Sequence, residues 1–446
     1  MALRPKNHFY ALIAYEDAYV QPLILAALQK LFTPESYTLL TPPTSKPQPN
    51  PHAESRKSNE DEDEGVISLP SLLPANHPDA SVLQITPYEA IDWEYVAEHP
   101  RSCLVNSYML RKALIRKHYL ASTIEHWVAK RPQSALSGHV KRAEAFEVDY
   151  AEFLDDALVE AFDLRASLER NAQINEGDGN KGDVEWWILK PSMSDRGQGI
   201  RLFSTMEELQ GIFDGWEGSD DEDEDEDEQE QEDGNGGKGD RDYITASHLR
   251  HFVAQPYIHP PLLLPNTANR KFHIRTYVAC VGALDVYVYR PMLALFAAKP
   301  YAAPGTQPAT ASGNEPIDLE AHLTNTCLQR SVKEGTVRRF WDLDMPYPPA
   351  AGEGDRKPHI FAQIRNITAD LFEAAARAMP MHFRPLPNAF EAYGLDFLVD
   401  AAGTAWLLEV NAFPDFRQTG EDKELRGLVQ GFWESVLRVA GGATLG

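Results

Sequence analysis

The C-terminal stretch YGLDFLVDAAGTAWLLEVNAF (residues 393–413) constrains the fold most, because it reads as two apolar strands around a turn of small residues. The first strand carries Asp396 among its apolar residues and the second carries Glu409. If the turn is 401–404, Asp400 faces Ala405 and, counting back, Asp396 faces Glu409. Opposed side chains of an antiparallel pair lie about 5 Å apart at Cβ, so the two acids would repel each other.

A divalent cation would remove this repulsion. Asn411 follows Glu409 by two residues and therefore shares its strand face. Mg²⁺ usually takes one or two protein carboxylates, with substrate phosphates and water completing its shell. The sequence thus predicts a Mg²⁺ site at Asp396, Glu409 and Asn411. The alternative is a solvated strand pair with ordinary acids, and the apolar residues that flank both acids argue against full solvation.

Length and composition bound the class of protein. The chain has 446 residues, which favours two or three domains. It has three cysteines, which fits a reducing compartment and argues against a disulfide framework or a cysteine zinc site. Much of the net charge of −25 lies in acidic blocks at 59–65 and 217–240, which we expect to be solvated and disordered. Without an apolar run long enough for a membrane span, we expect a cytoplasmic monomer that binds neither membranes nor, directly, nucleic acid.

Strand and helix patterns alternate along the chain and predict an α/β (α+β) protein. We expect a strand–helix–strand unit over 8–40, helices over 106–132, 146–169, 361–380 and 425–440, and a long β-hairpin over 271–290. These patterns suggest an N-terminal α/β domain at 1–100 with a disordered linker at 41–66, a central lobe at 101–260 with the acidic insert 217–240, and a C-terminal lobe at 261–446 with a loose insert at 302–318.

The stretch ILKPSMSDRGQGIRLF (188–203) has the composition of a phosphate-holding loop. Lys190 ends an apolar strand, and Ser192, Gly197 and Gly199 offer a hydroxyl and a backbone that can approach phosphate oxygens closely. It is not a P-loop, because the lysine precedes the glycines and a strand follows. A plain turn is the alternative.

Three basic residues share one face of the predicted strand RKFHIRTYV (270–278). Lys271, His273 and Arg275 alternate with uncharged residues. They would repel one another unless an anion such as a nucleotide triphosphate lay between them. From this stretch alone the simpler interpretation is an exposed edge strand with its cations in water. In FVAQPYI (252–258), Gln255 could read an adenine edge while Ile258 packs on the ring.

These segments, taken in order, resemble the tubulin-tyrosine-ligase-like family of the ATP-grasp superfamily. The resemblance rests on LRKALIRK (110–117), LKPSMSDRGQGI (189–200), VAQPYIHPPLLL (253–264), RKFHIRTYV, HLTN (322–325) and the C-terminal hairpin, and its details are closest to a fungal branch with P-body-associated members. It implies a nucleotide between two β-rich lobes. The implied roles are Lys112 and Lys190 on phosphates, Gln255 and Ile258 at the adenine, Lys271 and His273 beside the nucleotide, Arg275 at the γ-phosphate and the acceptor, and Asp396, Glu409 and Asn411 on Mg²⁺.

The implied activity is an ATP-dependent ligase that activates a carboxylate as an acyl phosphate and joins it to an amine. Its partners would be an amino acid and a protein acceptor, with tubulin one candidate. Two positions depart from the family pattern: His273 stands where the family has an aspartate, and Leu295 stands where it has an arginine. Arg290 is close in sequence to Leu295, but strand alternation puts it on the opposite face, so it would not substitute for that arginine. Two alternatives therefore stay open: a nucleotide-binding pseudoenzyme that scaffolds RNA–protein granules or the cytoskeleton, and a ligase for a non-tubulin or small-molecule acceptor.

Overall fold

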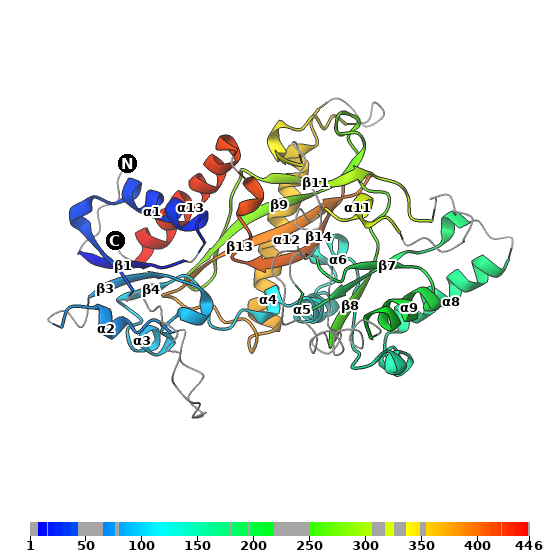
Figure 1. Ribbon diagram of the computed structural model, residues 1–446, viewed down its shortest axis with the longest axis horizontal. Coiled ribbons are helices and arrows are strands. Elements are labelled where there is room, and N and C mark those ends of the chain that lie inside the picture. Colours follow the sequence, from blue (N-terminus) through cyan, green and yellow to red (C-terminus); the bar gives the residue numbers. More distant parts are fainter. Residues whose placement is uncertain are drawn as a thin grey trace, which may run out of the picture.

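Three β-sheets follow one another across the molecule in the computed structural model (Figure 1). It describes residues 8–15, 17–42, 66–75, 80–177, 181–194, 197–217, 250–305, 317–324, 336–347, 354–420 and 422–444. Most of the predicted linker 41–66, the acidic insert after Glu217 and most of the insert 302–318 lie outside these ranges. No helix of the described part is long and apolar enough to cross a membrane.

The N-terminal sheet is parallel and confirms the predicted strand–helix–strand unit. Its order is β2 (Tyr37–Leu40), β1 (Phe9–Ile13), β3 (Ser81–Ile85) and β4 (Cys103–Val105). Helix α1 (Val20–Leu31) joins β1 to β2, and the short helices α2 (Leu69–Leu72) and α3 (Trp93–Glu98) flank β3. Near-continuous apolar strands are typical of a parallel sheet that is covered on both faces.

The large antiparallel sheet holds both predicted hairpins. Its order is β12 (Val337–Arg339), β11 (Leu293–Pro300), β9 (Arg270–Val281), β13 (Phe390–Val399) and β14 (Ala405–Ala412), and β10 (Asp285–Val288) pairs with the far end of β9. The interpretation of β9 as an exposed edge strand is wrong. It lies between β11 and β13, and Lys271, His273 and Arg275 are only 3–6% exposed.

One face of β9 is polar in the first half of the strand and apolar in the second half. Its first half carries Lys271, His273 and Arg275, and its second half carries Tyr277 and Ala279 in the apolar core beneath α13 (Lys423–Thr444). Helix α12 (Lys357–Ala378) covers the opposite face of the sheet. Helix α13 also packs beside α1, so both ends of the chain share one core (Figure 1). Neither helix covers the polar half of β9, which residues of β6 and β8 face instead.

The third sheet forms the lobe opposite β9. Its order is β5 (Glu144–Glu147), β8 (His251–Pro256), β6 (Trp187–Pro191) and β7 (Arg201–Phe203). Helices α4 (Lys112–Ile115), α5 (Lys117–Lys130) and α6 (Ala135–His139) connect the N-terminal sheet to it, and α9 (Met206–Glu217) follows β7.

The single amphipathic helix predicted over 146–169 is wrong. The segment contains the end of β5, a 3₁₀ turn, the short α7 (Leu154–Ala157) and the start of α8 (Phe162–Glu176). That prediction relied on an apolar stripe that included Phe153 and Phe162, but these residues are 47% and 72% exposed. Leu154, Leu158, Leu164 and Leu168 are buried instead, which two separate helical segments achieve and one continuous helix with the predicted stripe does not.

A buried ion pair links the residue that precedes α4 to the large sheet. Arg111 pairs with Glu391 of β13, which also accepts a hydrogen bond from the Tyr393 hydroxyl at 2.6 Å. Removing one partner leaves the other charge buried without its counter-ion.

We predict that Arg111→Met lowers the free energy of unfolding by about 3–5 kcal/mol, because Glu391 is then a buried unpaired acid. Adding Glu391→Leu should recover most of that loss, since the double variant buries no lone charge. Urea unfolding of the three proteins measures both effects. A double variant that is less stable than Arg111→Met would contradict this explanation.

Candidate active site

Three charged residues form a row across three neighbouring strands. Arg275 of β9 is the register partner of Asp396 of β13, and Asp396 is the partner of Glu409 of β14. The Arg275 Nε atom lies 2.5 Å from Oδ1 of Asp396, and its Nη2 lies 3.0 Å from Oδ2. The predicted juxtaposition of the two acids is therefore confirmed.

The register that produces it differs from the predicted one. Ala405 faces Val399 rather than Asp400, and an irregularity after Asp396 restores the pairing with Glu409. Asp400 instead stabilises the turn, where its Oδ1 accepts a hydrogen bond from the Thr404 amide at 2.9 Å. A bulge of this kind adds one residue to one strand. The predicted pairing next to the turn is therefore wrong by one residue, whereas the pairing beyond the bulge is correct.

The two acids differ in proton affinity. Burial raises the pKa of Asp396 to about 7 against the opposing effect of Arg275, and Glu409 adds to the rise. Burial acts in the same direction on Glu409, but the charge of Lys117, a hydrogen bond from Asn411, and the charges of Lys190 and Arg275 outweigh it and lower its pKa to about 2. The Asn411 Nδ2 atom lies 3.2 Å from Oε1 of Glu409 and 3.5 Å from Oδ2 of Asp396. The three predicted metal ligands are thus brought together.

Two buried lysines line the same pocket as the two acids. The Lys190 Nζ atom lies 2.8 Å from Oε1 of Gln255, and the Lys271 Nζ atom lies 2.9 Å from the Tyr257 hydroxyl. Burial lowers the pKa of Lys190 to about 8 and, together with Lys190, lowers that of Lys271 to about 7. Neither lysine makes an ion pair with a described residue, and Glu409 and Asp396 only partly support the charge of Lys190.

In the polar first half of β9, two atoms are buried without a hydrogen-bond partner among the described residues: Nε2 of His273 and Nη1 of Arg275. Burial and the charge of Arg275 lower the pKa of His273 to about 3, so the ring is neutral. Its Nδ1 lies 2.6 Å from Oγ1 of Thr324, just after α11 (Leu319–His322). Buried polar atoms without partners are uncommon and often mark the place of a ligand.

These side chains line a narrow pocket between the third sheet (β5–β8–β6–β7) and the large sheet. Its walls include Ile188, Lys190, Ile200, Gln255, Tyr257, Ile258, Lys271, His273, His322, Asp396, Leu398 and Glu409. Only about 70 Å³ is open to solvent, which is room for roughly two waters. A wider cleft of about 1180 Å³ begins at Lys190 and Gln255, so the narrow pocket adjoins space that a larger ligand can use.

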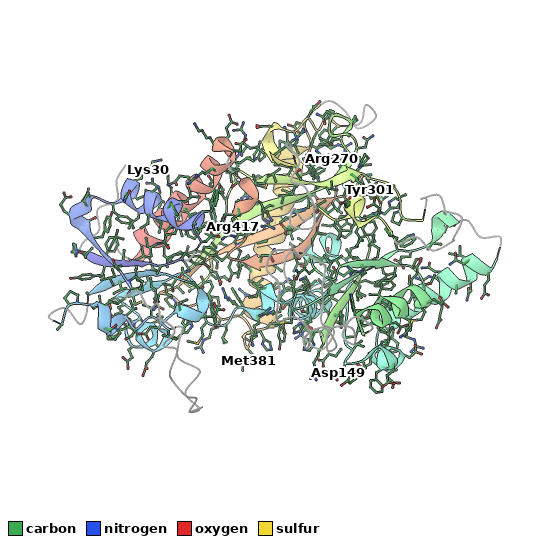
Figure 2. All side chains as sticks on the ribbon, in the orientation of Figure 1. Lys30, Asp149, Arg270, Tyr301, Met381 and Arg417 are labelled. Atoms are coloured by element: carbon green, nitrogen blue, oxygen red, sulfur yellow. The ribbon has the colours of Figure 1, made fainter. Side chains whose placement is uncertain are left out.

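A second pocket lies on the other side of the acidic pair. It has about 350 Å³ and is lined by Tyr15, Asp17, His273, Arg275, Glu409, Asn411, Phe413, Asp415, Arg417 and Gln418. His273 and Glu409 line both pockets. Figure 2 shows Arg417 where the N-terminal layer meets the large sheet, and its Nε lies 3.0 Å from Oδ2 of Asp17.

The predicted phosphate loop contacts the start of α5, the helix that carries Lys117 and His118. The Ser192 hydroxyl lies 2.6 Å from Nδ1 of His118, and Gly197 and Gly199 have positive φ values of 83° and 71°. Lys112 is exposed at the start of α4 and lines none of the pockets described above. Asn325 of HLTN lies outside the described residues.

Sequence reasoning missed two residues that shape this site. Lys117 is the last residue of LRKALIRK, and at the start of α5 it bonds the Ser194 carbonyl at 3.0 Å and helps lower the pKa of Glu409. A Cβ on Gly394 would lie 2.6 Å from Pro414 and 3.2 Å from Arg275, so only glycine fits behind that arginine. Lys117 could have been found from the motif, whereas the demand on Gly394 required the fold.

The structure also shows what surrounds the two positions that depart from the family pattern. Leu295 is the cross-strand partner of His273 and is fully buried, so a leucine lies next to the site where the pattern has a cation. The Arg290 guanidinium stacks on Trp341, 4.6 Å from its ring centroid, on the α12 side of the sheet. It therefore does not replace the missing arginine.

The chain is similar in sequence to proteins of one known family. The sequence pattern of the Tubulin-tyrosine ligase family matches residues 97–441. A probable tubulin–tyrosine ligase of Schizosaccharomyces pombe is 45% identical over 359 residues, which cover 79% of this chain and 81% of the relative. The probable tubulin–tyrosine ligase PBY1 of Saccharomyces cerevisiae is 44% identical over 355 residues, but the match spans 79% of this chain and only 44% of that protein.

A solved structure extends the likeness to the fold. The C-terminal domain of Kluyveromyces lactis Pby1, described as an ATP-grasp enzyme that interacts with the mRNA decapping enzyme Dcp2, superposes with a TM-score of 0.59 at 34% identity, covering 96% of this chain and 92% of that one. A probable tubulin polyglutamylase of rat, TTLL9, is more distant at 25% identity over 76% of this chain and 68% of its own. The chain has an α/β ATP-grasp fold and belongs to the tubulin-tyrosine ligase family.

Proposed function

We propose that the protein is an ATP- and Mg²⁺-dependent ligase that joins a carboxylate to an amine. The observation that carries the proposal is the row of Arg275, Asp396 and Glu409, which lies in the wall between two pockets. A phosphoryl group passing from a nucleotide in one pocket to a carboxylate in the other would cross this row.

The narrow pocket has the chemistry of a nucleotide site. Lys190 and Lys271 are buried cations without a counter-ion among the described residues, which a triphosphate would supply. Gln255 and Ile258 lie on the β8 side, where an amide and an apolar side chain suit an adenine ring. Because the open volume is small, nucleotide binding requires Lys190 to leave Gln255 or the two sheets to move apart.

The residues present also fit Mg²⁺. Asp396, Glu409 and Asn411 supply the oxygen ligands that this ion prefers. Phosphates and water would complete the shell of an ion held there. Bound there, Mg²⁺ would neutralise phosphate charge.

The reaction follows from what the side chains can hold. A carboxylate oxygen of one substrate attacks the γ-phosphorus of ATP, ADP leaves, and an acyl phosphate forms. An amine then attacks the acyl carbon, and inorganic phosphate leaves as the amide forms. Lys190 and Lys271 hold the transferring phosphates, while the free Nη1 of Arg275 can bind the phosphate or the carboxylate.

The second pocket suits the acyl substrates. It combines the cations Arg275 and Arg417 with the acids Asp17 and Asp415, so it can pair with both a carboxylate and an ammonium. We propose that an amino acid and the end of an acceptor protein meet here. The Asp17–Arg417 pair then brings the N-terminal layer into the substrate site.

A second candidate function is a nucleotide-binding scaffold with no ligase activity. Leu295 beside His273 favours it, because the family pattern has an arginine there. The partner printed for the Kluyveromyces lactis structure, Dcp2, suggests a decapping complex and P-bodies as the setting. ATP-dependent incorporation of a labelled amino acid into protein, absent in Glu409→Gln, would establish the ligase. Nucleotide binding without incorporation across a panel of amino acids and acceptors would favour the scaffold.

We predict that Asp396→Asn and Glu409→Gln each weaken Mg²⁺-dependent ATP binding at least about tenfold. Titration calorimetry with and without Mg²⁺ measures the effect, and circular dichroism checks that the fold is kept. Glu373→Gln, which removes a partly exposed acid on α12 whose ion pair is with Arg377, is the matched control. Unchanged Mg²⁺-dependent affinity in both site variants would remove the metal assignment.

The affinity for ATP should fall as the pH rises from about 7 to about 9. The pKa values of Lys271 and Lys190 are about 7 and about 8 in the free protein, so each loses its charge above that pH. A bound triphosphate favours the charged form and raises both pKa values, so binding takes up protons in this window. Calorimetry in buffers of different ionisation enthalpy measures the uptake, which Lys271→Met should reduce. Because a cation at Asp396 would release a proton in the same window, the decisive comparison is between proteins: equal proton uptake by Lys271→Met and the unchanged protein would show that Lys271 does not face the phosphates.

Arg417→Gln should raise the KM for the acceptor by about fivefold, the loss expected of one partly exposed charge contact. The affinity for ATP should stay unchanged, since Arg417 lines only the second pocket among those described here. Arg426→Gln is the control, because that exposed arginine lies nearby over the Tyr19 ring but outside the pocket. Equal effects of the two variants would place the acceptor elsewhere.

A further inference from the structure

The Nε2 atom of His273 lacks a partner although it lies at the centre of the site. The residue is 3% exposed, and no described residue bonds this atom. The cross-strand neighbours of His273 are Leu295 and Leu398, whose side chains offer no hydrogen bond. A buried ring nitrogen without a hydrogen-bond partner calls for an explanation, and a bound ion is one.

The position of this nitrogen relative to Asp396 indicates the kind of ligand. Nε2 lies 3.5 Å from Oδ1 of Asp396, longer than the usual range of a hydrogen bond, about 2.7–3.2 Å. Two atoms that coordinate one ion at about 2.1 Å lie roughly 3.0–3.5 Å apart, depending on the angle between them. The spacing therefore suits two ligands of a shared cation.

A hydrogen bond to Thr324 fixes the ring as a metal ligand needs when Nδ1 carries the proton. The Thr324 Oγ1 atom lies 2.6 Å from Nδ1, and a hydroxyl can accept a hydrogen bond from an Nδ1–H group. In that tautomer the lone pair of Nε2 points away from Thr324. Histidine ligands are commonly fixed in this way by a hydrogen bond from the other ring nitrogen.

We propose that His273 is a nitrogen ligand of the nucleotide-bound cation, shared with Asp396, and that the site consequently prefers a first-row transition ion such as Mn²⁺ over Mg²⁺. This inference rests on the proposed nucleotide function and adds a ligand to it. Imidazole nitrogen binds transition ions better than it binds Mg²⁺, which takes oxygen ligands. Glu409, Asn411 and phosphate oxygens complete the set. The aspartate of the family pattern at this position would supply oxygen instead, so the exchange to histidine changes the choice of metal.

Pulsed electron paramagnetic resonance of Mn²⁺ tests the proposal directly. The full chain, grown with ¹⁵N-histidine, is loaded with Mn²⁺ and a non-hydrolysable ATP analogue. We expect ³¹P coupling from the phosphates and ¹⁵N coupling of the strength of a directly bound imidazole, which the label separates from adenine nitrogens. His273→Asp should remove the ¹⁵N coupling and keep the ³¹P coupling. The preference for Mn²⁺ over Mg²⁺ in competition should fall about tenfold in that variant.

His322→Asn is the matched control, because His322 lines the same pocket but bonds the Tyr257 hydroxyl at 2.9 Å. It should keep the ¹⁵N coupling. Phosphorus coupling without histidine coupling in the unchanged protein would overturn the inference and leave the nucleotide site standing. Absence of both couplings would overturn the nucleotide site as well.

Discussion

The ion pair between Arg275 and Asp396 is the interaction on which this site depends. It is buried within the large sheet, and Glu409 lies on the other side of Asp396. Burying charge costs free energy unless partners compensate, and here one guanidinium faces two acids. The pKa of Asp396 is raised to about 7 as a result, so this carboxyl lies close to the balance between its charged and neutral forms. A further cation at the acids would relieve this imbalance, and it would also offset the charge of an anion bound at Arg275.

The surrounding fold holds this row at a junction of three layers. Strand β9 supplies polar residues where the central lobe faces it and apolar residues where α13 covers it. The N-terminal layer reaches the second pocket through Asp17, and α5 reaches the acids through Lys117. Each layer therefore contributes charge to one site. This explains why segments far apart in sequence must pack together before the site exists.

Strand alternation predicted which residues share a face, and it did so correctly for β9 and for the C-terminal hairpin. It could not predict what covers that face, so the cations of β9 were interpreted as solvated although the central lobe buries them. The opposition of Asp396 and Glu409 was predicted from a turn count that was wrong by one, and a bulge restored it. Alternation and turn length are local properties, whereas bulges, burial and the contact of Gly394 with Pro414 depend on the tertiary fold. The same limit explains the failed helix over 146–169.

A crystal structure of the full chain with Mg²⁺ and a non-hydrolysable ATP analogue tests the central claim most directly. The account predicts a triphosphate against Lys190 and Lys271, with the ion joining it to Asp396 and Glu409. A nucleotide bound elsewhere, or an unchanged Arg275–Asp396 pair with no ion beside it, would contradict the account.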